Sequence, residues 1–167
     1  MYINKPPRKP QAPIAICATL FAIAATLVIL SALKIGWNLG EQIGALLCIV
    51  IGIEITTRYL MTEYEYRLNG EGEQSEMAVI KRGGSRELTV CHFDFSTVMT
   101  VQRRGKLREM ERKYGRIHTR YSYCVNMRSP DRAWIYFTFN EKRVLLEIEA
   151  NEVFFAELQR RVLENSR

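Results

Sequence analysis

The residue types that most often do chemistry lie together in one short stretch, Cys91-His92-Phe93-Asp94. A thiol, an imidazole and a carboxylate could serve as nucleophile, base and orienting group. Neighbours on a strand point to opposite faces, however, so Cys91 and His92 would diverge if this stretch is extended. His92 and Asp94 would share a face and could supply two metal ligands, but the spacing identifies no third. We therefore predict a core cysteine and a surface histidine, with no catalytic residue, no metal and no cofactor.

The second chemical feature is an excess of positive charge between Val101 and Arg132. This segment holds ten basic residues and three acids, whereas the whole chain has a net charge of +6. Apolar side chains at helical spacing predict a helix from Lys106 to about Tyr114. Basic side chains attract anionic lipid headgroups, so we predict a lipid-binding surface. Its candidate residues are Arg103, Arg104, Lys106, Arg108, Arg112, Lys113 and Arg116.

Three other interpretations of these charges remain open. The helix could be a solvated element that docks on the domain by its apolar face. The surface could instead bind a protein partner. Basic residues near Tyr114, Tyr121 and Tyr123 could also bind nucleic acid, but no recognised motif supports this, so nucleic acid is the least favoured partner.

Two apolar stretches precede the strands. Residues Ile14 to Leu33 carry no charge, and twenty residues of helix span about 30 Å, the thickness of a hydrocarbon core. A second stretch runs from Gln42 to Ile53 and continues past Glu54 to Met61. The short connection predicts a transmembrane helical hairpin over residues 14–61. A cleaved signal peptide is the alternative, but its apolar region is typically only about 7 to 15 residues long.

Small residues recur every four positions in both stretches, and such stripes let helices approach closely in lipid. We expect the two stripes to pack on each other, with homodimerisation through the same stripe as the alternative. Glu54 precedes Arg58 by four residues, which predicts an interfacial ion pair, with a proton relay or ion site as the functional alternative for an acid within a membrane helix. The helix-packing candidates are Gly44, Cys48 and Gly52 on the second helix and Ala18 and Ala22 on the first.

The charges that flank the hairpin predict its orientation. Residues 1–13 contain four prolines and three basic residues, so we expect an extended, mobile tail rather than a folded element. Counting positive charges places both termini in the cytoplasm of a two-pass inner-membrane protein. Cys91 and Cys124 would then face a reducing compartment and remain thiols.

Residues 62–167 are expected to form one mostly-β domain. Alternating apolar and polar residues indicate about seven antiparallel strands, and a final amphipathic helix begins after Asn151 with an apolar face that includes Phe154 and Leu158. These elements are typical of a pleckstrin-homology-like barrel capped by its helix. The expected strands are 62–69, 76–81, 86–93, 95–101, 121–127, 133–139 and 143–149.

The order of parts resembles a family of small uncharacterised bacterial two-pass membrane proteins. The resemblance rests on YEYRLNGE, LTVCHFDF, NMRSPDRAWIYFTF and LLEIEANE, and this chain departs from the family in its basic segment after Val101. The resemblance implies a C-terminal pleckstrin-homology-like domain without assigned catalytic residues. We therefore expect a membrane-anchored, non-catalytic binding or scaffold module, or alternatively a protein-docking subunit of a membrane complex.

Overall fold

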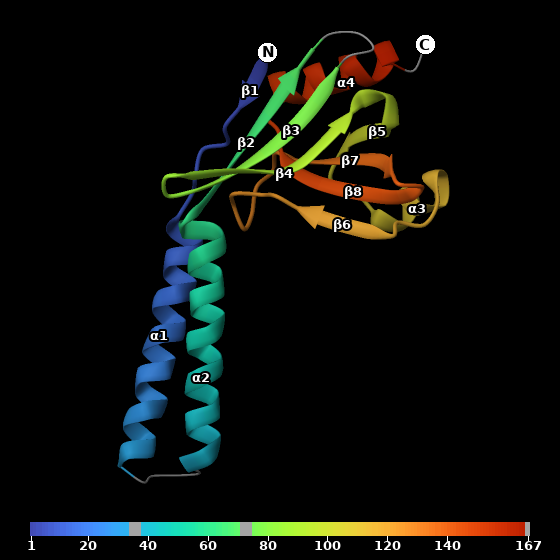
Figure 1. Cartoon of the computed structure of the whole chain (residues 1–167). Coiled ribbons are helices and arrows are strands. Elements are labelled where there is room, and N and C mark those ends of the chain that lie inside the picture. The colour runs from blue at the N-terminus through green and yellow to red at the C-terminus, as the bar shows by residue number, and fades with distance from the viewer. Residues whose placement is uncertain (34–37, 71–74, 166–167) are drawn as a thin grey trace. The chain divides into compact units, whose positions relative to one another are not determined.

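The computed structural model describes residues 1–33, 38–70 and 75–165, which separate into two compact units (Figure 1). Met1–Pro7 and the chain from Glu63 onward form the first unit, called the β domain below. Arg8–Thr62 form the second unit, called the helical hairpin. Residues 34–37 of the expected turn lie outside the described residues.

The helical hairpin consists of α1 (Gln11–Ala32) and α2 (Asn38–Ile55), extended by one π-helical turn, η1 (Thr56–Leu60). The segments Gln11–Ala32 and Leu39–Leu60 are both long enough and apolar enough to cross a membrane. Large apolar side chains, among them Ile29 and Val50, are exposed on the outer surfaces of the pair. An apolar surface on all sides is unfavourable in water and suits lipid. The predicted pair of long apolar helices is therefore confirmed.

The small residues of α2 face α1, as predicted. A Cβ atom on Gly52 would lie 3.0 Å from the Phe21 ring, and one on Gly44 would lie 3.2 Å from Leu27. Cys48, between the two glycines, is half-buried. The Cys17 Sγ lies 3.6 Å from the carbonyl oxygen of Gly52. The two helices thus approach closely where α2 has no side chain.

On α1, in contrast, the predicted stripe does not face the partner helix. Ala18 and Ala22 are both exposed. The contacting positions of α1 recur mostly in steps of four and three, which keeps them on one side of the helix, and Ala18, one position after the buried Cys17, points about 100° away from that side. The buried or half-buried positions are Pro13, Cys17, Leu20, Ala24, Leu27, Leu30 and Ser31.

Substitution of Gly52 by Leu should loosen the hairpin, since the new side chain would overlap the Phe21 ring. Overpacking of this kind costs about 1–3 kcal/mol. The labelling rate of the buried Cys17 thiol by N-ethylmaleimide in mild detergent should rise. Ala18→Leu is the matched control, because Ala18 is exposed. Equal rates in the two variants would contradict this packing of the hairpin.

The expected ion pair between Glu54 and Arg58 is not formed. Both side chains are exposed, and the Arg58 guanidinium lies 5.5 Å from the centroid of the Tyr59 ring. The chain changes from α2 to the wider turn of η1 between the two residues, and a π-helical turn displaces residues that are neighbours at four-residue spacing.

The N-terminal segment is not wholly an unfolded tail, so that prediction is wrong. Tyr2–Asn4 form strand β1, which pairs antiparallel with β2 (Thr62–Asn69). Asn4 is buried and its Nδ2 donates to the carbonyl oxygen of Glu149. Arg8 donates to the carbonyl oxygens of Leu60 and Thr62 and so caps the end of η1.

The β domain contains two open four-stranded sheets (Figure 1). The first has the order β1-β2-β3-β4, with β3 at Glu76–Gly83 and β4 at Arg86–Asp94. A 3₁₀ turn, η3 (Phe95–Thr97), leads to the second sheet. The second sheet has the order β5-β7-β8-β6 and comprises β5 (Val98–Arg103), β6 (Thr119–Ser122), β7 (Arg132–Phe139) and β8 (Lys142–Glu149).

Two features of the sheets differ from the prediction. The sheets do not close into a barrel, because no pairing among the described residues joins an edge of one sheet to an edge of the other. The strands are also not all antiparallel, since β6 runs parallel to β8. The connection from β5 to β6 contains helix α3 (Leu107–Tyr114), and a helical crossover of this kind permits parallel alignment.

The core lies between the two sheets and α4 (Glu152–Asn165). Phe154 and Leu158 of α4 are fully buried among residues from both sheets, while Phe155 and Val162 pack at the margin of the core. The expected turn between β7 and β8 is also present, with Asn140 and Glu141 at positive φ angles of 47° and 62°. The docked C-terminal helix is therefore confirmed.

Candidate functional site

The Cys91-His92-Phe93-Asp94 stretch does not assemble a reactive site. Cys91 packs partly against the core, and burial raises the pKa of its thiol to about 11. His92 is exposed and its Nε2 lies 3.1 Å from the Glu76 carboxylate. Among the described residues, no three His, Cys, Asp or Glu side chains gather where they could hold a metal ion.

Helix α3 is docked on the outer face of the second sheet. Met110 is buried against Trp134, Tyr136 and Leu145, with Leu107, Tyr114 and Ile117 beside it. The Tyr136 hydroxyl donates toward the carbonyl oxygens of Tyr114 and Gly115 at the end of the helix. Gly115 has a φ of 93°, and a Cβ atom there would overlap the Arg143 guanidinium, so glycine is required. The predicted apolar face of this helix is confirmed.

The opposite side of α3 and the chain just beyond its end form a cationic surface, which we call the basic face: Arg108, Arg112 and Lys113 of the helix, and Arg116 after Gly115. All four side chains are exposed. The Lys113 ammonium lies 5.1 Å from the centroid of the Tyr114 ring. Within the described chain, no acid forms an ion pair with these four residues, whereas Lys106 pairs with Glu109 at 3.4 Å. The basic face therefore has cations available for an external anion.

Arg103 has a structural role rather than a place on this face. Its Nη1 donates to the carbonyl oxygens of Asp131 and Ala150 at 3.1 and 2.6 Å. Its guanidinium also lies 4.3 Å from the centroid of the Phe155 ring on α4. Arg103 thus joins the end of β5 to the end of β8 and to α4, and its charge is committed to internal contacts.

Arg104 belongs to a cluster around Glu147, a carboxylate that is only 2% exposed. Arg120 Nη2 and Arg132 Nη1 lie 2.9 and 3.4 Å from its oxygens, and Arg104 Nε lies 3.7 Å away. Arg132 also donates to the carbonyl oxygens of Asn126 and Met127. Three cations from three parts of the chain therefore surround one buried anion.

These arginines determine the protonation of Glu147. Burial alone would raise its pKa, but the hydrogen bond and charge of Arg120, with the charge of Arg132, lower the pKa below the ordinary value of 4.5. Glu149 lies on the same strand and behaves oppositely, since burial raises its pKa despite hydrogen bonds from Asn126. Neighbouring acids of β8 are thus held in different electrostatic environments.

The Glu147 cluster was not predicted from the sequence, although a signal was present. Glu147 and Glu149 alternate within an otherwise apolar run, Val144 to Ala150. Acids in a buried strand need a cationic or hydrogen-bonding partner, and the neighbouring basic segment contains several. The sequence therefore indicated that some of these cations would be internal, but not which ones.

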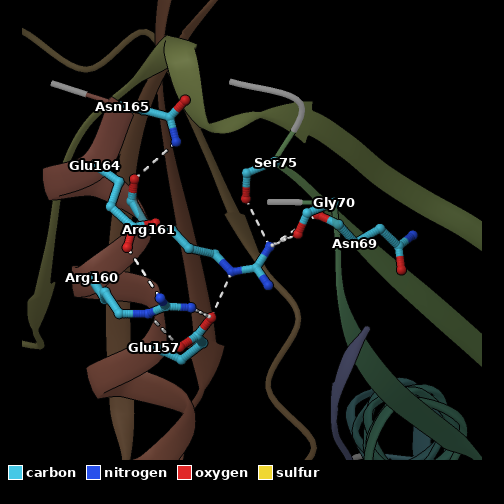
Figure 2. Close-up of polar contacts among 8 residues, drawn as sticks. All are labelled: Asn69, Gly70, Ser75, Glu157, Arg160, Arg161, Glu164 and Asn165. Carbon is cyan, nitrogen blue, oxygen red and sulfur yellow. Dashed lines mark hydrogen bonds and ion pairs between the residues drawn. The ribbon is translucent and has the colours of Figure 1, made fainter. Parts of the chain in front are cut away.

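Arg161 of α4 is a buried arginine that connects the helix to the first sheet (Figure 2). Its Nη1 donates to the carbonyl oxygens of Asn69 and Gly70 and to Ser75 Oγ, at distances from 2.7 to 3.0 Å. Its Nε lies 2.8 Å from Glu157 Oε1. Figure 2 shows the guanidinium reaching from the helix to the end of β2 and to Ser75, which precedes β3. All these partners are internal, so this cluster holds the fold together.

Comparison with family models, with curated proteins and with solved structures gives no match. The basic face is therefore the candidate site on physical grounds alone. Of the seven predicted lipid-binding residues, four form this face, Lys106 lies beside its start in an ion pair, and Arg103 and Arg104 make the internal contacts described above.

Proposed function

We propose that this chain is a membrane-anchored, non-catalytic binding module whose basic face contacts anionic lipid headgroups of the inner leaflet. The observation that supports the proposal best is the exposure of Arg108, Arg112 and Lys113 on a helix whose other side is docked, with Arg116 exposed just beyond its end. A cation near an anionic surface contributes about 1 kcal/mol. Several such contacts would give measurable binding.

The two apolar helices supply the anchor in this proposal. Arg8, Lys5 and Lys9 precede the first helix, so counting positive charges favours cytoplasmic termini. Met61 alone separates η1 from β2. A link of one residue keeps the β domain within reach of the lipid surface, which raises the effective concentration of headgroups.

The finer fold and family assignments are also part of the proposal. A meander of antiparallel strands, a second sheet and a C-terminal helix packed between them support a pleckstrin-homology-like domain. The open sheets and the parallel strand β6 depart from a closed barrel. Membership in the family of small bacterial two-pass membrane proteins rests on the sequence resemblance.

Hydrogen exchange of the full chain in lipid nanodiscs tests the lipid contact. The amides of α3 should exchange about ten-fold more slowly in discs that contain anionic phosphatidylglycerol than in neutral phosphatidylcholine discs. A ten-fold change corresponds to about 1.4 kcal/mol of added stability for the docked helix. Added salt should remove the difference, because dissolved ions screen exposed charges, with a screening length of about 8 Å at physiological ionic strength. The double variant Arg108→Gln with Arg112→Gln should lose the difference.

The matched control is Lys81→Gln with Arg86→Gln, which removes the same charge from exposed positions of the first sheet. The control should keep the lipid-dependent protection. Equal exchange of wild-type α3 in neutral and anionic discs would show that the basic face is only solvated. Docking of a protein partner would then be the better-supported function of this chain.

A further inference from the structure

A cleft with a volume of about 450 Å³ lies within the β domain, where the edge strand β4 borders the second sheet. A little more than half of its exposed wall is apolar, and a cleft of this size is typical of small-molecule sites, which measure about 300–1,000 Å³. The side chains that give it this character are Val90, Tyr121, Tyr123, Phe137, Phe139 and Val144.

Two aromatic side chains at this cleft are unusually exposed. Phe139 and Tyr121 are 55% and 45% exposed, and Tyr121 stacks on Tyr123 with an interplanar angle of 4°. Ordered aromatic rings that remain in contact with solvent mark an interaction site when they gather around a cleft. Cys91 also lines the cleft, and burial raises the pKa of its thiol to about 11, so the thiol adds no negative charge there.

The polar groups at the cleft favour an anion. Lys142 is exposed, and no acid forms an ion pair with it among the residues that the structure describes. The other candidate cation, His92, is already held by Glu76 at 3.1 Å. Asn140 adds an amide near Lys142. A ligand with an apolar body and one anionic end would match this arrangement.

An added peptide strand fits the cleft less well, although β4 and β6 are both edge strands. The pairing of β4 with β3 shifts register between Val79 and Ile80, which marks a β-bulge beside the cleft. Tyr123 Oη also donates to the carbonyl oxygen of Val90 at 3.3 Å. A bulged edge with an occupied acceptor does not present the regular ladder that strand addition requires.

We propose that this cleft binds a long-chain carboxylate, such as a fatty acid, with the alkyl chain against Tyr121, Phe137 and Phe139 and the carboxylate at Lys142. The site is separate from the basic face, so it does not depend on the function proposed above.

The test uses the full chain in neutral phosphatidylcholine nanodiscs and a hexadecanoate probe that carries a photoreactive diazirine in its chain. After irradiation, mass spectrometry compares labelled peptides from residues 90–92 and 119–123 with labelled peptides from α1 and α2. The helix peptides report simple partitioning into lipid. We expect cleft labelling that excess oleate removes and that the same concentration of oleyl alcohol leaves largely intact.

Variants separate the two parts of the site. Thr119→Trp, which fills the cleft from β6, should reduce cleft labelling at least about ten-fold. Lys142→Gln should reduce it about ten-fold and abolish the preference for oleate over oleyl alcohol. Lys81→Gln, another exposed lysine, should change neither. Because Lys142 is exposed, its variant remains informative even if Thr119→Trp fails to fold.

Label confined to the helix peptides would overturn the proposal. So would cleft labelling that excess oleate does not reduce, because such labelling is non-specific. Equal competition by oleate and oleyl alcohol in the wild type would show that Lys142 recognises no carboxylate, and the assigned ligand class would then be wrong.

Discussion

Replacement of Arg161 by Met should lower the free energy of unfolding of the β domain by about 3–5 kcal/mol, the usual cost of removing one partner from a buried charged cluster. Arg161 has only a 5% exposed side chain and satisfies two backbone carbonyls, Ser75 Oγ and Glu157. Met fills a similar space but donates no hydrogen bond. The carbonyl groups of Asn69 and Gly70 would be left without this donor.

The matched control is Arg160→Met, one position earlier on the same helix. Arg160 is 56% exposed and pairs with Glu157 and Glu164, so its loss should cost no more than about 1 kcal/mol. Pulse proteolysis of the full chain in urea, within nanodiscs, measures both variants on one scale. Similar losses of stability would show that Arg161 does not hold α4 to the first sheet.

Replacement of Glu147 by Gln should destabilise the β domain by about 3 kcal/mol, because three guanidinium groups would then face one another without their shared anion. Arg104 and Arg120 are half exposed, so water offsets part of this repulsion. Glu87→Gln serves as control, since Glu87 is 51% exposed and its pair with Arg82 is accessible to water. A loss as small as that of the control would contradict the cluster.

The pH dependence of stability gives a second measurement on Glu147. Its folded-state pKa is lowered from the ordinary 4.5, so its contribution is fully present above about pH 4.5 and is lost as the pH falls through the folded-state pKa. Glu157 acts in the same direction, because Arg160, with Arg161, lowers its pKa to about 2. Glu149, with a raised pKa, acts in the opposite direction.

The Glu147→Gln variant should therefore lose less stability than the wild type between about pH 4.5 and pH 2, although it is less stable at neutral pH. Urea unfolding at several pH values measures this difference. Parallel pH profiles for the two proteins would show that Glu147 is not stabilised as an anion. The same experiment on Glu87→Gln should give a profile close to that of the wild type.

The sequence by itself determined the elements of this protein, because local periodicity reports which side of an element meets an apolar environment. Twenty uncharged residues from Ile14 predicted α1, and the spacing of apolar residues predicted α3 and α4 close to their observed limits. Alternation also located most strands. Two strands were exceptions: β1 was not predicted, and β6 spans Thr119–Ser122 rather than the predicted 121–127, since only three and four residues form these strands.

Only the tertiary structure decided which elements and charges meet. β1 pairs with a strand more than sixty residues away, and β6 aligns with β8 through a helical crossover. Such pairings depend on loop closure and on contacts between distant segments, which leave no local pattern. The same holds for the basic segment: Arg103 and Arg104 are neighbours of Arg108 in the chain, yet they bind internal carbonyls and Glu147 while Arg108 faces solvent. Which cations pair with a buried acid depends on their positions in the folded domain. Composition could therefore predict an excess of positive charge, but not which basic side chains lack an internal acidic partner.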